Sequence, residues 1–143
     1  MDMDNYITVR FPAISENESL ARLTAAAFIM GLDPYMDELA DIKTAVSEAV
    51  TNAIIHGYDG ISGEVELKCA IKDATVYIEV KDEGRGIEDI KKAMEPMFTT
   101  KPGGERTGLG FTIMQSFMDE VQVESERGKG TVIKMNKTIN KSL

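Results

Sequence analysis

The sequence has very few of the residues that build covalent or metal-linked scaffolds. Cys69 is the only cysteine and His56 is the only histidine among 143 residues. A single cysteine excludes an internal disulfide and favours a reducing compartment, and one cysteine with one histidine matches no usual zinc pattern. Apolar residues alternate with polar ones around Cys69, so we expect its thiol to lie in the core of the protein.

The sequence also lacks a long hydrophobic run and an excess of positive charge. No apolar stretch approaches the roughly 18 residues that cross a bilayer, and the N-terminus has no basic-then-apolar signal layout. The net charge is −8, with 16 basic and 24 acidic residues, which disfavours nucleic acid as a direct partner. We expect one soluble cytoplasmic domain over residues 1–143, without a membrane contact.

The pattern of hydrophobic residues predicts grouped helices and strands. This grouping favours an α+β fold, in which a mixed sheet of about five strands forms a two-layer α/β sandwich with helices on one face. A polar tail is expected over residues 137–143. The predicted order is strand 7–11, a helix from Glu16, a helix from Asp33-Pro34 to His56, a hairpin of strands 65–71 and 76–80, a helix opening at 108–110, and strands from 121 and 131.

The helix that begins near Glu16 carries an apolar stripe and one isolated basic residue. Arg22 is the only basic residue between Arg10 and Lys43. It is a candidate anchor for a partner, although a plain exposed arginine is the alternative. The stripe expected to pack on the core is Leu20, Leu23, Ala27 and Met30.

Residues 41–57 combine a packing stripe with a row of polar side chains. Glu48 and Asn52 are four residues apart, so they lie on one face of the predicted helix, and His56 extends the row by a turn. We expect Gly57 to end the helix in the left-handed conformation. A solvated polar face is the alternative explanation of this row.

Eight of the twelve glycines fall between Gly84 and Gly130. Such glycines allow a backbone to approach a ligand closely, and Gly108-Leu109-Gly110 precedes a helix whose N-terminus favours an anion. Each pair alone is also compatible with a plain turn. The chain has neither a P-loop motif nor a complete G-x-G-x-x-G motif, so a phosphate site here would be of another kind.

Three side chains have chemistry suited to a nucleotide site. Asp82 follows a predicted strand and can accept a hydrogen bond from the amine of adenine, although it can also simply start a turn. Glu48 can act as a general base, and Asn52 offers a neutral oxygen to Mg²⁺. Residues 96–107 have no periodicity, two prolines and a Gly-Gly pair, which is typical of a mobile lid.

Together these motifs resemble those of the GHKL superfamily. Residues 48–57 resemble its N-box, residues 82–86 its first glycine box and residues 107–110 its second. The resemblance covers nearly the whole chain and implies a Bergerat-type fold that binds ATP or ADP with Mg²⁺. It implies Asn52 on the metal, Asp82 on adenine, supported by Thr131, and the phosphates over the second glycine box. The further nucleotide-binding residues implied are His56, Gly84, Gly86, Thr99, Lys101, Arg106, Thr107, Gly108, Leu109 and Gly110.

Within the superfamily, the chain resembles the single-domain anti-sigma serine kinases of sporulating bacilli. This resemblance implies a homodimer that binds a sigma factor and phosphorylates a serine of an anti-anti-sigma antagonist, with Glu48 as the catalytic residue and Arg22 as a partner contact. Lys101 and Arg106 would neutralise charge on the γ-phosphate. Two alternatives remain open: an ATP-gated binding module with little kinase activity, and the catalytic domain of a sensor histidine kinase.

Overall fold

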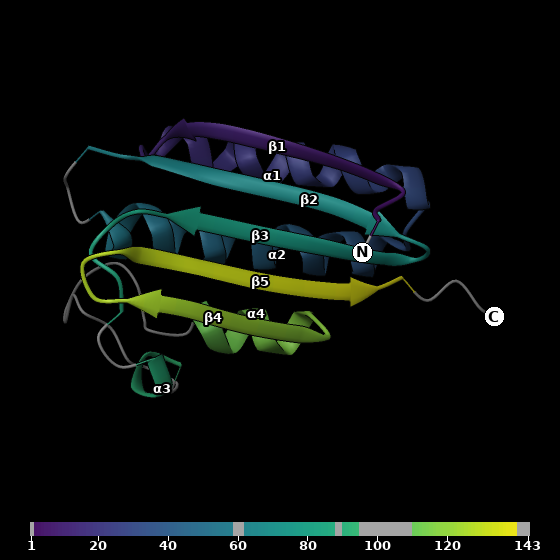
Figure 1. The fold of residues 1–143 in the computed structure, drawn as a ribbon. Helices are drawn as coiled ribbons and strands as arrows, with labels where there is room; N and C mark the ends of the chain where they lie inside the picture. The colour runs from purple at the N-terminus through teal and green to yellow at the C-terminus, as the bar shows by residue number, and fades with distance from the viewer. Residues whose placement is uncertain (1, 59–61, 88–89, 95–109, 140–143) are drawn as a thin grey trace.

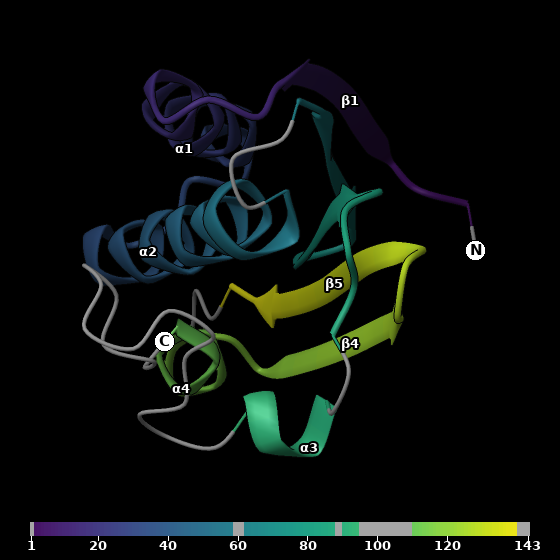
Figure 2. The same ribbon diagram turned by 90° about the vertical axis from the view of Figure 1, so that its left-hand side faces the viewer.

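A five-stranded sheet, covered on one face by helices, forms the frame of the protein (Figures 1 and 2). The computed structural model describes residues 2–58, 62–87, 90–94 and 110–139. The strands are β1 (Asn5–Pro12), β2 (Glu64–Lys72), β3 (Thr75–Asp82), β4 (Glu120–Glu126) and β5 (Gly130–Thr138). The helices are α1 (Glu16–Ile29), α2 (Met36–Asn52), α3 (Ile90–Ala93) and α4 (Gly110–Phe117), with a 3₁₀ turn η1 (Met30–Leu32) and a π-helical turn η2 (Ala53–Gly57).

The strands lie in the order β1-β2-β3-β5-β4, and each described pair of neighbours is antiparallel. The α+β sandwich class is therefore confirmed, but the expectation of a mixed sheet is wrong. The reason lies in the last hairpin. β3 and β4 run in the same direction, as strands joined through a helix often do. However, β5 folds back from β4 and inserts between them, so the two parallel strands are not neighbours.

Helices α1, α2 and α4 pack against one face of the sheet, and α2 lies in the middle (Figure 2). The central position of α2 follows from its sequence, because its apolar residues recur at helical spacing. Five of them, Ile42, Ala45, Val46, Ala49 and Val50, have no exposed surface. No helix in the described part of the chain combines the length and apolar character that crossing a bilayer requires.

Helix α1 packs through a different stripe from the one that the sequence predicts. Ala21, Ala25 and Ile29 are buried against α2. By contrast, Leu20, Leu23 and Met30 of the predicted packing stripe remain 51%, 57% and 55% exposed. The predicted stripe is wrong, because α1 buries the side that carries Ala21, Ala25 and Ile29, and Ala27 of the predicted stripe is exposed as well.

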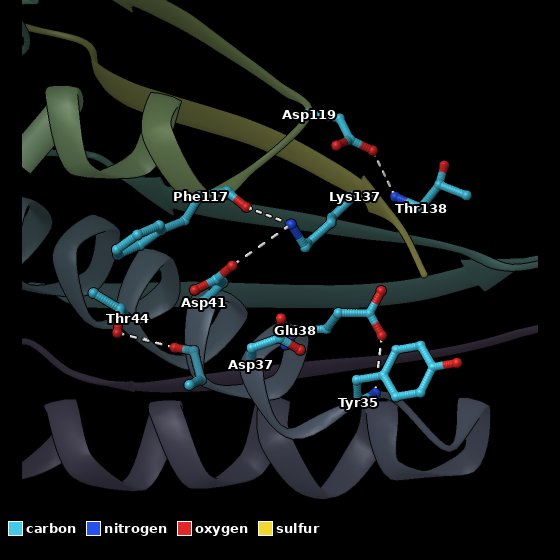
Figure 3. A network of polar contacts seen from close by, with 10 residues as sticks. Tyr35, Asp37, Glu38, Asp41, Thr44, Phe117, Asp119, Lys137 and Thr138 are labelled. Carbon is cyan, nitrogen blue, oxygen red and sulfur yellow. Dashed lines mark hydrogen bonds and ion pairs between the residues drawn. The ribbon is translucent and has the colours of Figure 1, made fainter. Parts of the chain in front are cut away.

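The start of α2 is also set differently from the prediction. Asp33 takes a left-handed conformation, with φ of 51°, and α2 begins at Met36 and not at Asp33-Pro34. The carboxylate of Glu38 accepts the backbone N–H of Tyr35 at 2.9 Å and thereby closes the first turn (Figure 3). The side chain of Glu38, in the first turn of the helix, thus takes the capping role that was expected of Asp33.

A lysine at the end of β5 connects the sheet to helices α4 and α2. The Nζ of Lys137 donates to the carbonyl of Phe117, the last residue of α4, at 2.8 Å and lies 3.8 Å from the carboxylate of Asp41 on α2 (Figure 3). The lysine charge suits a helix C-terminus. Residues 137 and 138 belong to β5, and Ile139 is only 2% exposed. The prediction of a free tail is therefore wrong for residues 137–139, and residues 140–143 lie outside the described part of the chain.

The packing predicts a large difference between two leucine-to-alanine substitutions. Leu67 on β2 has no exposed surface, whereas Leu23 on α1 is 57% exposed. We expect Leu67→Ala to lower the free energy of unfolding by about 2–5 kcal/mol through lost burial and a residual cavity. Leu23→Ala should change it by less than about 0.5 kcal/mol. Urea denaturation of both variants measures the difference, and equal losses would contradict this packing.

Candidate nucleotide-binding site

The site begins where α2 widens into the π-helical turn η2. The N–H of Tyr58 donates to the carbonyl of Ala53, five residues back, at 3.2 Å. His56 lies within this wider turn, so its spacing from Asn52 does not follow the α-helical geometry on which the predicted row was based. Such turns occur often at functional sites. Gly57 does end the helical segment, but without the left-handed conformation predicted for it.

Gly57 is required because the carboxyl group of Asp82 lies directly against it. A Cβ atom added to Gly57 would stand 2.8 Å from Cγ and Oδ1 of Asp82. A side chain at this position would therefore push Asp82 out of place. The N-box glycine and the strand-end aspartate, which the sequence shows as separate motifs, form one packed contact.

Asp82 is a buried carboxyl at the end of β3, only 3% exposed. Burial raises its pKa from 3.8 to about 6, and hydrogen bonds from the backbone N–H groups of Gly84 and Thr131 oppose that rise. The bond from Gly84 is 2.9 Å long. A buried carboxylate is costly unless hydrogen-bond donors surround it. Asp82 is thus suited to receive a further donor from a ligand.

The first glycine box folds tightly against η2 and the β4–β5 turn. The N–H of Arg85 donates to the carbonyl of Gly57 at 2.8 Å, and its guanidinium Nε donates to the carbonyl of His56 at 2.9 Å. A Cβ on Gly84 would meet the Gly57 oxygen at 2.0 Å. Gly86 has φ of 77°, and a Cβ there would meet the carbonyl of Glu126 at 2.2 Å. Both positions therefore require glycine, because neighbouring backbone atoms occupy the space that a side chain would need.

A row of polar residues crosses the sheet on its helix-facing side. Asp82 on β3 is opposite Thr131 on β5, and Thr131 is opposite Ser125 on β4. Because side chains alternate along a strand, Thr131 shares the face of the buried Ile133 and Met135. Its hydroxyl lies 2.8 Å from that of Ser125. Thr131 is 3% exposed, and the strand register places it beside Asp82.

The remaining predicted residues fall into two groups. Glu48 and Asn52 are half-buried on the last turns of α2, immediately before the turn that contacts Asp82, and Gly110 begins α4, which packs on α2. Arg22 lies on α1, where it pairs with Glu18 at 3.7 Å. Six predicted residues lie outside the described part of the chain: Thr99, Lys101, Arg106, Thr107, Gly108 and Leu109.

Sequence reasoning missed two polar residues that organise the site. The hydroxyl of Tyr58 donates to the carbonyl of Glu64 and accepts the N–H of Glu83, next to Asp82, at 2.9 Å. The hydroxyl of Ser125 accepts the N–H of Ile87, the residue that follows the first glycine box, and lies within hydrogen-bond distance of the Thr131 hydroxyl. Ser125 was detectable in principle, because it continues the inward positions of Val121 and Val123 and is a polar residue on an apolar face.

The described residues fit a magnesium ion only if it arrives with phosphates. They contain no group of three or more His, Cys, Asp or Glu side chains able to hold a metal. Mg²⁺ commonly keeps several waters and takes one or two protein oxygens together with those of a polyphosphate. The carboxamide of Asn52 is a ligand of that kind, so the donor set suits a metal–nucleotide complex.

Comparison with known proteins identifies the family. Residues 11–137 match the family described as the histidine kinase-like ATPase domain. The chain is 58% identical over 141 residues to the anti-sigma F factor of Geobacillus kaustophilus and 52% identical over 141 residues to that of Bacillus subtilis; each match covers 98% of this chain and 97% of the relative. The chain therefore belongs to the histidine kinase-like ATPase family and, within it, to the anti-sigma F factors.

Solved structures show the same fold at low sequence identity. The RsbU and RsbW domains of Rv1364c from Mycobacterium tuberculosis superpose with a TM-score of 0.68 at 20% identity, over 94% of this chain and 32% of that one. The catalytic domain of the histidine kinase ThkA superposes with a TM-score of 0.59 at 20% identity, over 93% of this chain and 96% of that one. These likenesses confirm the predicted Bergerat-like architecture.

The raised pKa of Asp82 predicts how stability depends on pH. Between about pH 4 and pH 6 the folded chain holds the Asp82 proton more tightly than the unfolded chain does, so stability falls as pH rises through this window. Asp82→Asn removes the titration. Its free energy of unfolding relative to the native sequence should increase by up to about 3 kcal/mol between pH 4 and pH 7. Urea denaturation at several pH values tests this, and a pH-independent difference would contradict it.

Proposed function

We propose that the protein uses Mg-ATP to phosphorylate a serine of an antagonist protein and also binds a sigma factor. The observation that carries the proposal is the contact of Asp82 with Gly57 in η2, the turn that directly follows α2, on which Glu48 and Asn52 lie. This contact joins the adenine-binding candidate to the helix with the catalytic candidates. Membership in the anti-sigma F factor family supports the choice of partners.

In this proposal each residue has a separate chemical role. Asp82 and Thr131 receive the base, and Asn52 orients the metal, which would neutralise phosphate charge when bound. Glu48 takes the proton of the incoming serine hydroxyl, whose oxygen forms a bond to the γ-phosphorus while the bond to the β–γ bridging oxygen breaks and ADP leaves. Positioning and charge stabilisation supply most of the rate in such reactions.

The exposed side of α1 is the proposed docking surface for both protein partners. Leu20, Leu23 and Met30, the last of these in η1, are each about half-exposed or more, and Arg22 lies on the same helix, where it pairs with Glu18. Exposed apolar side chains beside an arginine are typical of protein interfaces. Because sigma factor and antagonist would use the same residues, they would compete. The proposal also includes a homodimer in the cytoplasm.

Incubation with labelled ATP and the antagonist tests the function as a whole. Acid-stable phosphoserine on the antagonist is the expected product. Acid-labile phosphate would indicate a histidine kinase instead. Nucleotide binding without any transfer would indicate an ATP-gated binding module, and each of these two results would overturn the proposed kinase.

Two substitutions on α2 should separate catalysis from nucleotide binding. Glu48→Gln keeps the shape of the side chain but removes the base, so phosphoryl transfer should fall by about 10²–10⁴-fold. Its ATP affinity should stay within about threefold of the native value. Asn52→Ala should weaken Mg-ATP binding itself, as measured by calorimetry. Unchanged transfer in Glu48→Gln would remove that residue from the catalytic role.

Arg22→Ala tests the docking surface. We expect it to weaken binding of both the sigma factor and the antagonist by at least about tenfold, because arginine anchors often dominate interfaces. ATP affinity should not change. Arg10→Ala is the matched control, since Arg10 lies on β1 and pairs at 2.7 Å with Glu66 on the neighbouring strand. If both arginine variants bind the partners equally well, α1 is not the docking surface.

A further inference from the structure

The hydroxyl group of Ser125 lies at the centre of a partly buried hydrogen-bond network on the edge strand β4. It is 2.9 Å from the carbonyl oxygen of Gly130, 2.7 Å from the backbone nitrogen of Ile87 and 2.8 Å from the hydroxyl of Thr131. These three partners come from the β4–β5 hairpin and from the residue that follows the first glycine box. Ser125 therefore connects the box to the strand that carries Thr131.

Only one arrangement of protons turns all three contacts into hydrogen bonds. A carbonyl can only accept, so the single proton of Ser125 goes to Gly130. The N–H of Ile87 can only donate, so it occupies one lone pair of Ser125. The proton that joins the two hydroxyls must then come from Thr131. The hydroxyl of Thr131 is thereby left with lone pairs alone for any other partner.

This direction has a consequence for what can bind beside Thr131. Thr131 is opposite Asp82 on the same face of the sheet, and the ionised carboxylate of Asp82 is also an acceptor. Both groups thus present acceptors to the same space. A ligand edge that offers N–H donors matches them, whereas a carbonyl oxygen in the same place would face lone pairs on both sides. A ligand without those donors would leave the acceptors of Asp82 and Thr131 unpaired, and a binding site rejects close analogues most strongly in this way.

We propose that Ser125 is a specificity-determining residue, which fixes Thr131 as a hydrogen-bond acceptor and so selects a purine with an amine over one with a carbonyl at position 6. Ser125 itself does not touch the base. It acts by setting the direction of the Thr131 hydroxyl. The inference rests on the proposed nucleotide site and adds to it the origin of its base selectivity.

ATP and inosine triphosphate are the appropriate probes, because they differ at position 6 and in the protonation of the adjacent ring nitrogen. The experiment measures the affinity of the full chain for each nucleotide with Mg²⁺ by calorimetry. The native protein should prefer ATP by at least about tenfold. In Ser125→Ala the Thr131 hydroxyl is free to rotate and donate, so the preference should fall by roughly five- to tenfold. The ratio of the ATP affinity to the inosine triphosphate affinity, measured on one variant, does not depend on the fraction of protein that is folded.

Two further variants act as controls. Ser125→Thr keeps the hydroxyl and should retain most of the preference for ATP. Ser116→Ala also removes a serine hydroxyl, but one that donates to the Thr112 carbonyl within α4, and it should leave the ratio unchanged. A loss of preference in Ser125→Ala that Ser125→Thr restores supports the inference.

The possible failures are distinguishable. If the native chain binds neither nucleotide, the proposed function fails. If it binds both equally, or if Ser125→Ala keeps the native preference, the nucleotide site stands and the role of Ser125 is wrong. If all three variants lose preference together, the effect is a general loss of packing, and the specific role of Ser125 is overturned.

Discussion

The architecture depends on one constraint, the burial of the Asp82 carboxyl at the end of β3 against a glycine of the neighbouring helix. An ionised group in that place is costly and needs donors around it. The chain supplies them from Gly84 and Thr131 and leaves Gly57 without a side chain so that the carboxyl fits. At neutral pH the buried Asp82 carboxylate lowers the stability of the empty protein. A ligand that donates a hydrogen bond to this carboxylate would offset that loss. Functional sites commonly reduce stability in this way.

The unusual strand order explains why the other polar residues gather at this point. Because β5 inserts between β3 and β4, Thr131 comes to lie directly beside Asp82, and Ser125 takes the next position outward. The antiparallel hairpin thus creates the row of three polar side chains, and the turn at its tip receives the first glycine box.

Much of the frame could be predicted from the sequence, because local patterns determine it. Alternating apolar residues located the strands, and the stripe from Ile42 to Val50 located α2 and therefore the row with Glu48. Features that depend on contacts between distant segments could not be predicted this way. The widening of η2 accompanies the packing of Gly57 on Asp82. Helix α1 carries apolar residues on two sides, and only its packing on α2 decides that Ala21, Ala25 and Ile29 turn inward.

The central claim is that a nucleotide base binds where the end of α2 meets the ends of β3 and β5. Titration of the labelled full chain with Mg-ATP, followed by amide chemical shifts, tests this claim most directly. The account predicts that the amides of Gly57, Gly84 and Thr131 shift first and saturate together. Shifts confined to the open face of the sheet, or no shifts at millimolar Mg-ATP, would contradict it.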